Sequence, residues 1–81
     1  MPMKRKDRLL AKARNTPNSL SFREFEILLA QCGWIFDHQT GSHRIWYSPQ
    51  GYRLPVQPKG SQAKRYQVKE FLSQYDKGDG K

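Results

Sequence analysis

Apolar residues recur with a helical period shortly after the first quarter of the chain. Ser21 can cap the start of this segment, and Glu24, three residues later, can bond back to it in a capping box. Gly33 is placed to end the helix in a left-handed conformation. The sequence therefore predicts a helix over residues 22–32, with an apolar stripe formed by Phe22, Phe25, Leu28, Leu29 and Cys32.

Three short extended runs follow the helix, each bounded by turn-forming residues. These runs cover residues 34–39, 43–48 and 52–56. In the middle run, alternation places His43, Ile45 and Tyr47 on one face and Arg44 and Trp46 on the other. The pattern predicts a three-stranded antiparallel meander, and a proline in the third run indicates an edge strand or an early end to pairing.

A second amphipathic helix is predicted over residues 62–75, after a break at 58–61. The order is α-β-β-β-α, which belongs to the α+β class. Each helix has one apolar stripe and the sheet needs one face covered, so we expect both helices on the same face. The other face of the sheet then stays open to solvent or a ligand.

The first 15 residues are strongly basic, and residues 4–14 fit either a short helix or a solvated arm. We expect this N-terminal segment at 1–15, one folded domain at 16–76 and a disordered tail at 77–81. Cys32 continues the apolar stripe of the first predicted helix, which indicates a buried thiol rather than a reactive one. A single cysteine allows no internal disulfide, which is typical of a cytoplasmic protein.

The formal net charge is +8, from 15 Lys and Arg against 7 Asp and Glu. A charge of this sign favours an anionic partner: a nucleic acid, an acidic protein or a membrane surface. No segment approaches the roughly 20 apolar residues of a membrane span. Neither a set of metal ligands nor a glycine-rich phosphate loop is visible, so no metal or cofactor is expected.

Histidine and cations are the remaining candidates for chemistry. RNA can be cut by its own 2′-hydroxyl if one group removes a proton, another supplies one, and positive charge lies near the phosphate. His43, which follows Gly41 and Ser42 at the start of a strand, is the better placed histidine. His38, near the end of the preceding strand, is a rival or a helper, and an ordinary half-exposed strand histidine is the alternative for both.

Cations for an RNA backbone are available on the strands and around the second long helix. We expect these to be Arg44, Arg53, Lys59, Lys64, Arg65 and Lys69. Aromatic side chains can also stack on unpaired bases where they are exposed. The candidates for stacking are Trp34, Trp46, Tyr47 and Tyr52, of which we expect one or two to be available.

The runs LLAQCGW, GSHRIWYSPQGYRLPV and AKRYQVKEFL, in this order and spacing, resemble the HicA family of type II toxins. The resemblance covers about residues 20–76 and rests on a Gly-Ser-His turn, a Pro-x-Gly hairpin and the closing helix. It implies a double-stranded-RNA-binding-domain-like fold and metal-independent cleavage of mRNA. It also implies that His43 of the Gly41-Ser42-His43 motif is catalytic, and that a HicB antitoxin neutralises the toxin.

Two positions depart from common members of that family. Many members carry a second histidine directly after the motif, where this chain has Arg44, or after the third strand, where it has Gln57 and Pro58. Neither position supports a second catalytic imidazole. Two other functions stay open, a non-catalytic module that binds double-stranded RNA and a basic accessory protein for an acidic partner.

Overall fold

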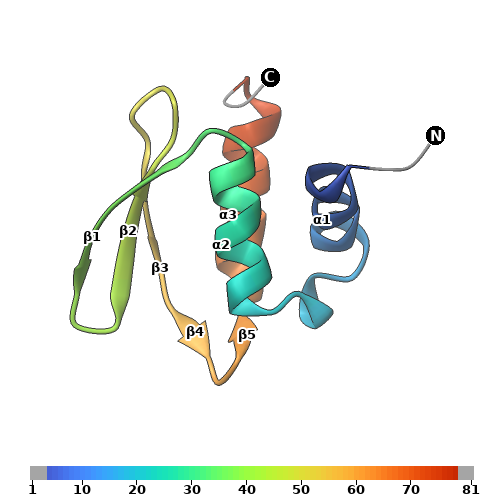
Figure 1. The fold of residues 1–81 in the computed structure, drawn as a ribbon, viewed down its shortest axis with the longest axis horizontal. Helices are drawn as coiled ribbons and strands as arrows, with labels where there is room; N and C mark the ends of the chain where they lie inside the picture. Colours follow the sequence, from blue (N-terminus) through green and yellow to red (C-terminus); the bar gives the residue numbers. More distant parts are fainter. Residues whose placement is uncertain (1–3, 79–81) are drawn as a thin grey trace.

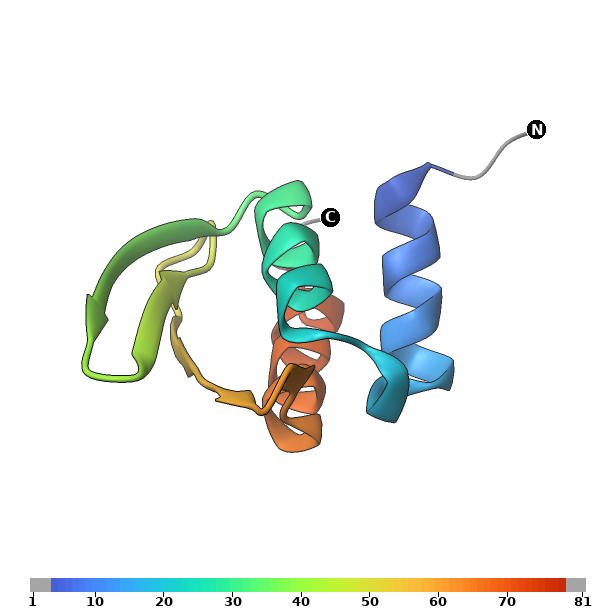
Figure 2. The same ribbon diagram turned by 60° about the horizontal axis from the view of Figure 1, so that its bottom comes forward.

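The computed structural model describes residues 4–78 and arranges them in three layers (Figures 1 and 2). The sheet forms one outer layer, α2 and α3 lie side by side in the middle, and α1 lies beyond them. The elements are α1 (Arg5–Asn15), a 3-10 turn (Pro17–Ser19), α2 (Phe22–Gln31), β1 (Ile35–Thr40), β2 (His43–Tyr47), β3 (Arg53–Val56), β4 (Pro58–Lys59), β5 (Gln62–Ala63) and α3 (Arg65–Asp76). The predicted α+β class, with a three-stranded antiparallel sheet in the α-β-β-β-α order, is confirmed.

The start and end of α2 follow the local signals in the sequence. The Ser21 side chain accepts a hydrogen bond from the Glu24 amide, and the Glu24 carboxylate accepts one from the Ser21 amide, both at 3.0 Å. Gly33 ends the helix with a φ of 85°, a conformation that side chains other than glycine rarely adopt. The predicted helix is therefore confirmed to within one residue at its C-terminal end.

The meander has the order β1-β2-β3, with every neighbouring pair antiparallel. The face of the sheet toward α2 and α3 is called the inner face, and it contributes Trp46, Leu54 and Val56 to the hydrophobic core. The opposite, outer face has no helix upon it (Figure 1). The regular alternation of β1 is interrupted by a register shift between Phe36 and His38, which makes Asp37 a bulged residue.

The start of α3 differs from the prediction. Residues 62 and 63 belong to a small second sheet, β4-β5, and the helix begins only at Arg65. The reason lies in the backbone: the Ala63 amide donates to the Leu20 carbonyl, and the Ser61 carbonyl accepts from the Phe22 amide. These pairings hold the hairpin against the start of α2, and the same backbone groups cannot also serve a helix.

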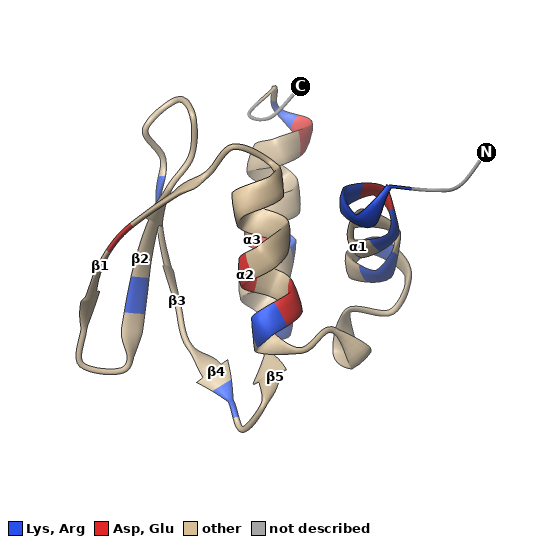
Figure 3. Ribbon diagram, in the orientation of Figure 1, with Lys and Arg blue, Asp and Glu red and all other residues tan. Residues whose placement is uncertain are grey.

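Of the two alternatives for the basic segment, the structure has the helix, α1. Leu9 and Ala13 are buried in the same hydrophobic cluster as residues of α2 and α3. Because α1 carries many of the cations in Figure 3, its packing brings charge onto the side of the molecule away from the sheet. The domain boundary expected at residues 15–16 stays a prediction, and residues 79–81 of the expected tail lie outside the described part.

Candidate functional site

His43 opens β2, and its side chain is exposed on the outer face of the sheet. The turn before it uses Gly41 in a left-handed conformation, with a φ of 60°, and no other atom lies within 4 Å of the position a Cβ would take. The Ser42 hydroxyl accepts a hydrogen bond of 2.9 Å from the Gln57 side-chain amide. The Gly-Ser-His turn thus presents an accessible imidazole next to a hydroxyl held in position.

The outer face of the sheet carries several other polar and titratable side chains besides this imidazole. Cross-strand register and alternation assign Ile35, His38, Thr40, His43, Ile45, Tyr47, Arg53 and Pro55 to it. Arg53 is exposed and is opposite Tyr47, so the expected strand cation shares the face of His43. His38 also lies on this face, and its ring nitrogen Nδ1 is 2.6 Å from the Asp37 carboxylate.

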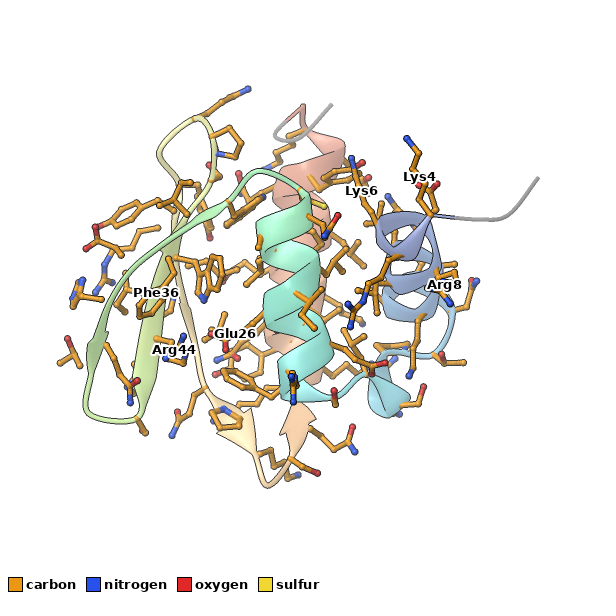
Figure 4. All side chains as sticks on the ribbon, in the orientation of Figure 1. Lys4, Lys6, Arg8, Glu26, Phe36 and Arg44 are labelled. Atoms are coloured by element: carbon orange, nitrogen blue, oxygen red, sulfur yellow. The ribbon has the colours of Figure 1, made fainter. Side chains whose placement is uncertain are left out.

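Arg44 lies on the inner face of the sheet, where its side chain points toward Glu26 of α2 (Figure 4). Its guanidinium forms an ion pair with Glu26 of α2 and lies over the Phe36 ring, 4.2 Å from the ring centroid. Glu26 also accepts a hydrogen bond of 3.0 Å from the Trp46 indole. Although it follows His43 in sequence, Arg44 therefore ties the sheet to α2, and its guanidinium is not brought beside the imidazole.

The other expected cations meet in one groove. The groove lies between the β4-β5 hairpin, the start of α3 and the 3-10 turn, and its lining includes Lys59, Lys64, Arg65, Tyr66 and Lys69. Within residues 4–78, none of the lysine and arginine side chains in it has a carboxylate partner. No side chain caps the N-terminus of α3, so the positive end of this helix faces the same region.

Gln57 connects this groove to the Gly-Ser-His turn. Its side-chain oxygen accepts a 3.3 Å hydrogen bond from the Lys64 ammonium, while its side-chain nitrogen donates to Ser42. Its backbone amide donates to the side chain of Gln67, which is buried. Residue 57 was noted in the sequence only as a departure from a histidine pattern, and no local signal revealed this bridging position.

Burial decides which aromatic side chains are accessible for stacking on a base. Trp34 and Trp46 are core residues with 2% and 6% of their surface exposed, so neither offers a face to a base. Tyr47 and Tyr52 are half-buried. Tyr66, which belongs to the closing-helix motif but was not among the stacking candidates, is 65% exposed and lines the basic groove.

Other kinds of chemistry find little support in the described residues. Cys32 is buried, and burial raises the pKa of its thiol, which disfavours the reactive thiolate. Across residues 4–78, His, Cys, Asp and Glu side chains form no group of three suited to a metal ion. In the same part of the chain, no helix has both the length and the apolar character needed to cross a bilayer.

A comparison with family models matches residues 22–76 to the HicA toxin of bacterial toxin–antitoxin systems. The match begins at the first residue of α2 and ends at the last residue of α3, so α1 lies outside it. No curated protein and no solved structure gives a significant match to the chain.

Proposed function

Because the chain belongs to the HicA family of bacterial toxins, whose counterpart is an antitoxin, we propose that it is an endoribonuclease that cleaves mRNA. In this proposal His43 is the catalytic histidine and the reaction needs no metal ion. The observation that carries the proposal is an exposed imidazole at the Gly-Ser-His turn, linked through Gln57 to a groove whose cations have no carboxylate partner among residues 4–78.

In this proposal the groove binds the RNA and the outer face of the sheet carries the catalytic histidine. Lys59, Lys64, Arg65 and Lys69 bind backbone phosphates, and the exposed ring of Tyr66 stacks on a base. Arg53 contributes positive charge on the face of His43. The bridge from Lys64 to Ser42 fixes where the RNA backbone leaves the groove and passes the imidazole.

The chemistry suits a protein of this size, since the substrate supplies its own nucleophile. The 2′-hydroxyl oxygen attacks the adjacent phosphorus, the bond to the 5′-oxygen breaks, and a 2′,3′-cyclic phosphate forms. His43 moves one of the two protons, because imidazole titrates near neutral pH and serves as acid or base. Gly41 supports it by leaving open space for the sugar–phosphate backbone, and Ser42 supports it through the hydrogen bond that its hydroxyl accepts from Gln57.

A HicB-like antitoxin is the proposed partner. An acidic protein segment fits the unpaired cations of the groove, and a segment laid across the Gly-Ser-His turn would also cover His43. With mRNA as substrate and such an antitoxin as partner, the proposed location is the cytoplasm. This part of the proposal predicts co-purification with one acidic protein and loss of RNA cleavage in the complex.

The decisive experiment compares the wild-type chain with His43→Ala on a defined mRNA in the presence of EDTA. Both proteins are purified in parallel, so that a contaminating nuclease would appear in both. We expect cleavage by the wild type, fragments with 2′,3′-cyclic phosphate ends, and a loss of at least about 100-fold in the variant. Equal cleavage by the two proteins, with matching circular dichroism spectra, would refute the catalytic role of His43.

A non-catalytic RNA-binding module is the second candidate, favoured by the groove at the start of α3. Such a module binds double-stranded RNA largely through shape and backbone contacts. It predicts intact RNA after incubation and an affinity that falls steeply with salt. RNA left whole by the wild type under all ionic conditions would favour it over the nuclease.

A further inference from the structure

A β-bulge brings the second histidine to the face of His43. The register of β1 on β2 shifts after Phe36, so that Asp37 is the extra residue and His38 is opposite Ile45. In an unbroken strand, residues two apart share a face, which would have put His38 on the inner face with Phe36. The bulge reverses this and turns the His38 side chain outward.

Two contacts on the inner face support this assignment independently. Phe36 lies against the Arg44 guanidinium, and Gln39 accepts a 3.0 Å hydrogen bond from the same group. Phe36 and Gln39 are three residues apart, which places them on one face only if the strand contains an extra residue between them. His38 precedes Gln39 and therefore lies on the outer face.

The bulged residue also orients the His38 ring. Asp37 and His38 are neighbours in sequence, and their side chains would point to opposite faces of a regular strand. At the bulge they meet, with the Asp37 carboxylate 2.6 Å from Nδ1 of His38. A carboxylate only accepts hydrogen bonds, so Nδ1 carries the hydrogen and Nε2 is the nitrogen left to exchange a proton.

The two imidazoles are diagonal neighbours across β1 and β2. His43 is opposite Thr40, and Ile45, two residues further along, is opposite His38. Diagonal positions of this kind lie about 7–8 Å apart, a separation that a phosphodiester group can occupy. Ile45, which is opposite His38 on the same face, is 1% exposed and therefore covered by the side chains around it.

We propose that His38 is the general acid of the RNA cleavage, with His43 as the general base. The inference rests on the proposed nuclease function and extends it to a second proton-transfer group. Neutral His43 takes the proton of the 2′-hydroxyl as the oxygen bonds to phosphorus. Protonated His38 gives its Nε2 proton to the 5′-oxygen as the bond from phosphorus to that oxygen breaks, and no other reactant is consumed.

The assignment of the two roles follows from the surroundings of each ring. The contact between Asp37 and His38 becomes an ion pair when the ring is protonated, as a proton donor must be. His43 has no carboxylate partner among residues 4–78. The other charged or titratable groups assigned to the outer face are Tyr47 and Arg53, at the far end of β2 and β3.

The test replaces the 5′-oxygen at a mapped cleavage site by sulfur. A thiolate leaves without being protonated, so this RNA does not need a general acid. With ordinary RNA we expect His38→Ala to slow cleavage by about 100-fold or more, and with the sulfur-containing RNA we expect it to approach the wild-type rate. His43→Ala should stay slow on both substrates, because loss of the base is not rescued.

Two further variants separate the role of charge from that of structure. Asp37→Asn should slow cleavage of ordinary RNA less than His38→Ala and should also be rescued by sulfur. Asp7→Asn removes a carboxylate from α1 and should leave both rates unchanged.

In the wild type, the rate with ordinary RNA should fall at both low and high pH, and His38→Ala should lose the fall at high pH.

The outcomes distinguish this inference from the nuclease proposal. If His43→Ala is inactive while His38→Ala cleaves ordinary RNA at the wild-type rate, the role of His38 is wrong and the nuclease stands. Loss of activity in His38→Ala without rescue by sulfur, in a folded protein, also refutes the general acid. A wild type that cleaves neither substrate overturns both proposals.

Discussion

Helices α1 and α3 both carry clusters of lysine and arginine, yet their side chains have different surroundings. On α1, Lys12 forms an ion pair with Glu24 of α2 and Arg14 forms one with Asp76 of α3. Lys6 lies over the Tyr75 ring, 5.9 Å from its centroid. These three cations hold α1 against the rest of the molecule, whereas Arg5 and Arg8 of the same helix are exposed.

The cations of α3 lie at its N-terminal end, where they line the groove. Lys64 bonds to the neutral side chain of Gln57, and no carboxylate of residues 4–78 pairs with it, with Arg65 or with Lys69. Net charge in a small basic protein therefore has two uses, one inside the fold and one toward an external partner. Only cations without an internal carboxylate keep their full charge for an external anion.

The largest expected effect comes from removing the groove cations. In the triple variant Lys64→Ala, Arg65→Ala, Lys69→Ala, three phosphate contacts are lost. Each contact to single-stranded RNA contributes about 0.7 to the slope of log affinity against log salt, so we expect the slope to decrease by about 2 and the affinity at 0.1 M salt to fall about 100-fold. Fluorescence anisotropy on a labelled RNA, in a salt titration, measures both quantities; inactive His43→Ala serves as background.

The matched control changes the same charge elsewhere. Arg5 and Arg8 of α1 and Lys4 just before it are exposed, and Lys4 and Arg8 lie on the side of the molecule away from the sheet (Figure 4). Replacing these three residues by alanine should reduce RNA affinity only slightly, because salt screens charges beyond about 10 Å. Equal losses of RNA affinity in the two triple variants would mean that the groove cations bind RNA no better than those at the start of α1.

The second prediction concerns α1 as part of the folded core. Leu9 is 7% exposed and packs in the main hydrophobic cluster, so Leu9→Ala should lower the free energy of unfolding by about 2 kcal/mol. Leu10→Ala, the same change one residue later at a half-buried position, should cost clearly less. Urea denaturation of both variants decides the matter, and equal stabilities of Leu9→Ala and wild type would mean that α1 does not dock.

Local sequence signals predicted the elements that local interactions determine. The capping box at Ser21 and Glu24 and the alternation along β2 specify structure within a few residues of chain, and both are confirmed. The bulge at Asp37 was missed, since it depends on how β1 pairs with β2, and a strict period of two places His38 on the wrong face. The start of α3 was predicted too early because Ala63 pairs with Leu20, 43 positions before it.

The candidate site shows the same limit. The motif identified His43 and the charge pattern identified the groove residues, yet neither indicated that Arg44 is held on the inner face by Glu26. Sequence neighbours on a strand point to opposite faces, so Arg44, which follows His43 directly, is expected on the other face of the sheet. The bridging position of Gln57 and the place of Tyr66 in the groove depend on segments that are distant in sequence, so local patterns did not indicate them.

The third prediction has a smaller expected effect and concerns Glu24 of α2, which forms an ion pair with Lys12 of α1. The hydrogen bond from the Ser21 amide, and then that from Lys12, hold the pKa of Glu24 below its ordinary value. Glu24 therefore stabilises the fold at a pH above its ordinary pKa, and this contribution is lost as the pH falls through the lowered folded value. We expect Glu24→Gln to cost about 1 kcal/mol at pH 7.

The difference between Glu24→Gln and wild type should shrink as the pH is lowered through that acidic range, because the wild-type carboxyl then becomes neutral as well. Urea denaturation at several pH values measures it. Lys12→Met is the companion variant, since it removes the ammonium and leaves the capping box. A difference that stays constant across the acidic range would assign the effect to the shape of the side chain and not to its charge.

The smallest effect is expected for the ion pair between Arg14 and Asp76. The two side chains form two hydrogen bonds of 3.1 and 2.7 Å, yet 43% and 53% of their surfaces are exposed. Exposed pairs contribute little, so a double-mutant cycle with Arg14→Ala and Asp76→Ala should give a coupling of about 0.5 kcal/mol that weakens in 1 M salt. The cycle is needed because Asp76 has interactions besides this pair. A coupling free energy well above that between Lys12 and Glu24 would mean that α1 is held mainly at its C-terminal end. Its apolar contacts would then contribute less to stability than the burial of Leu9 implies.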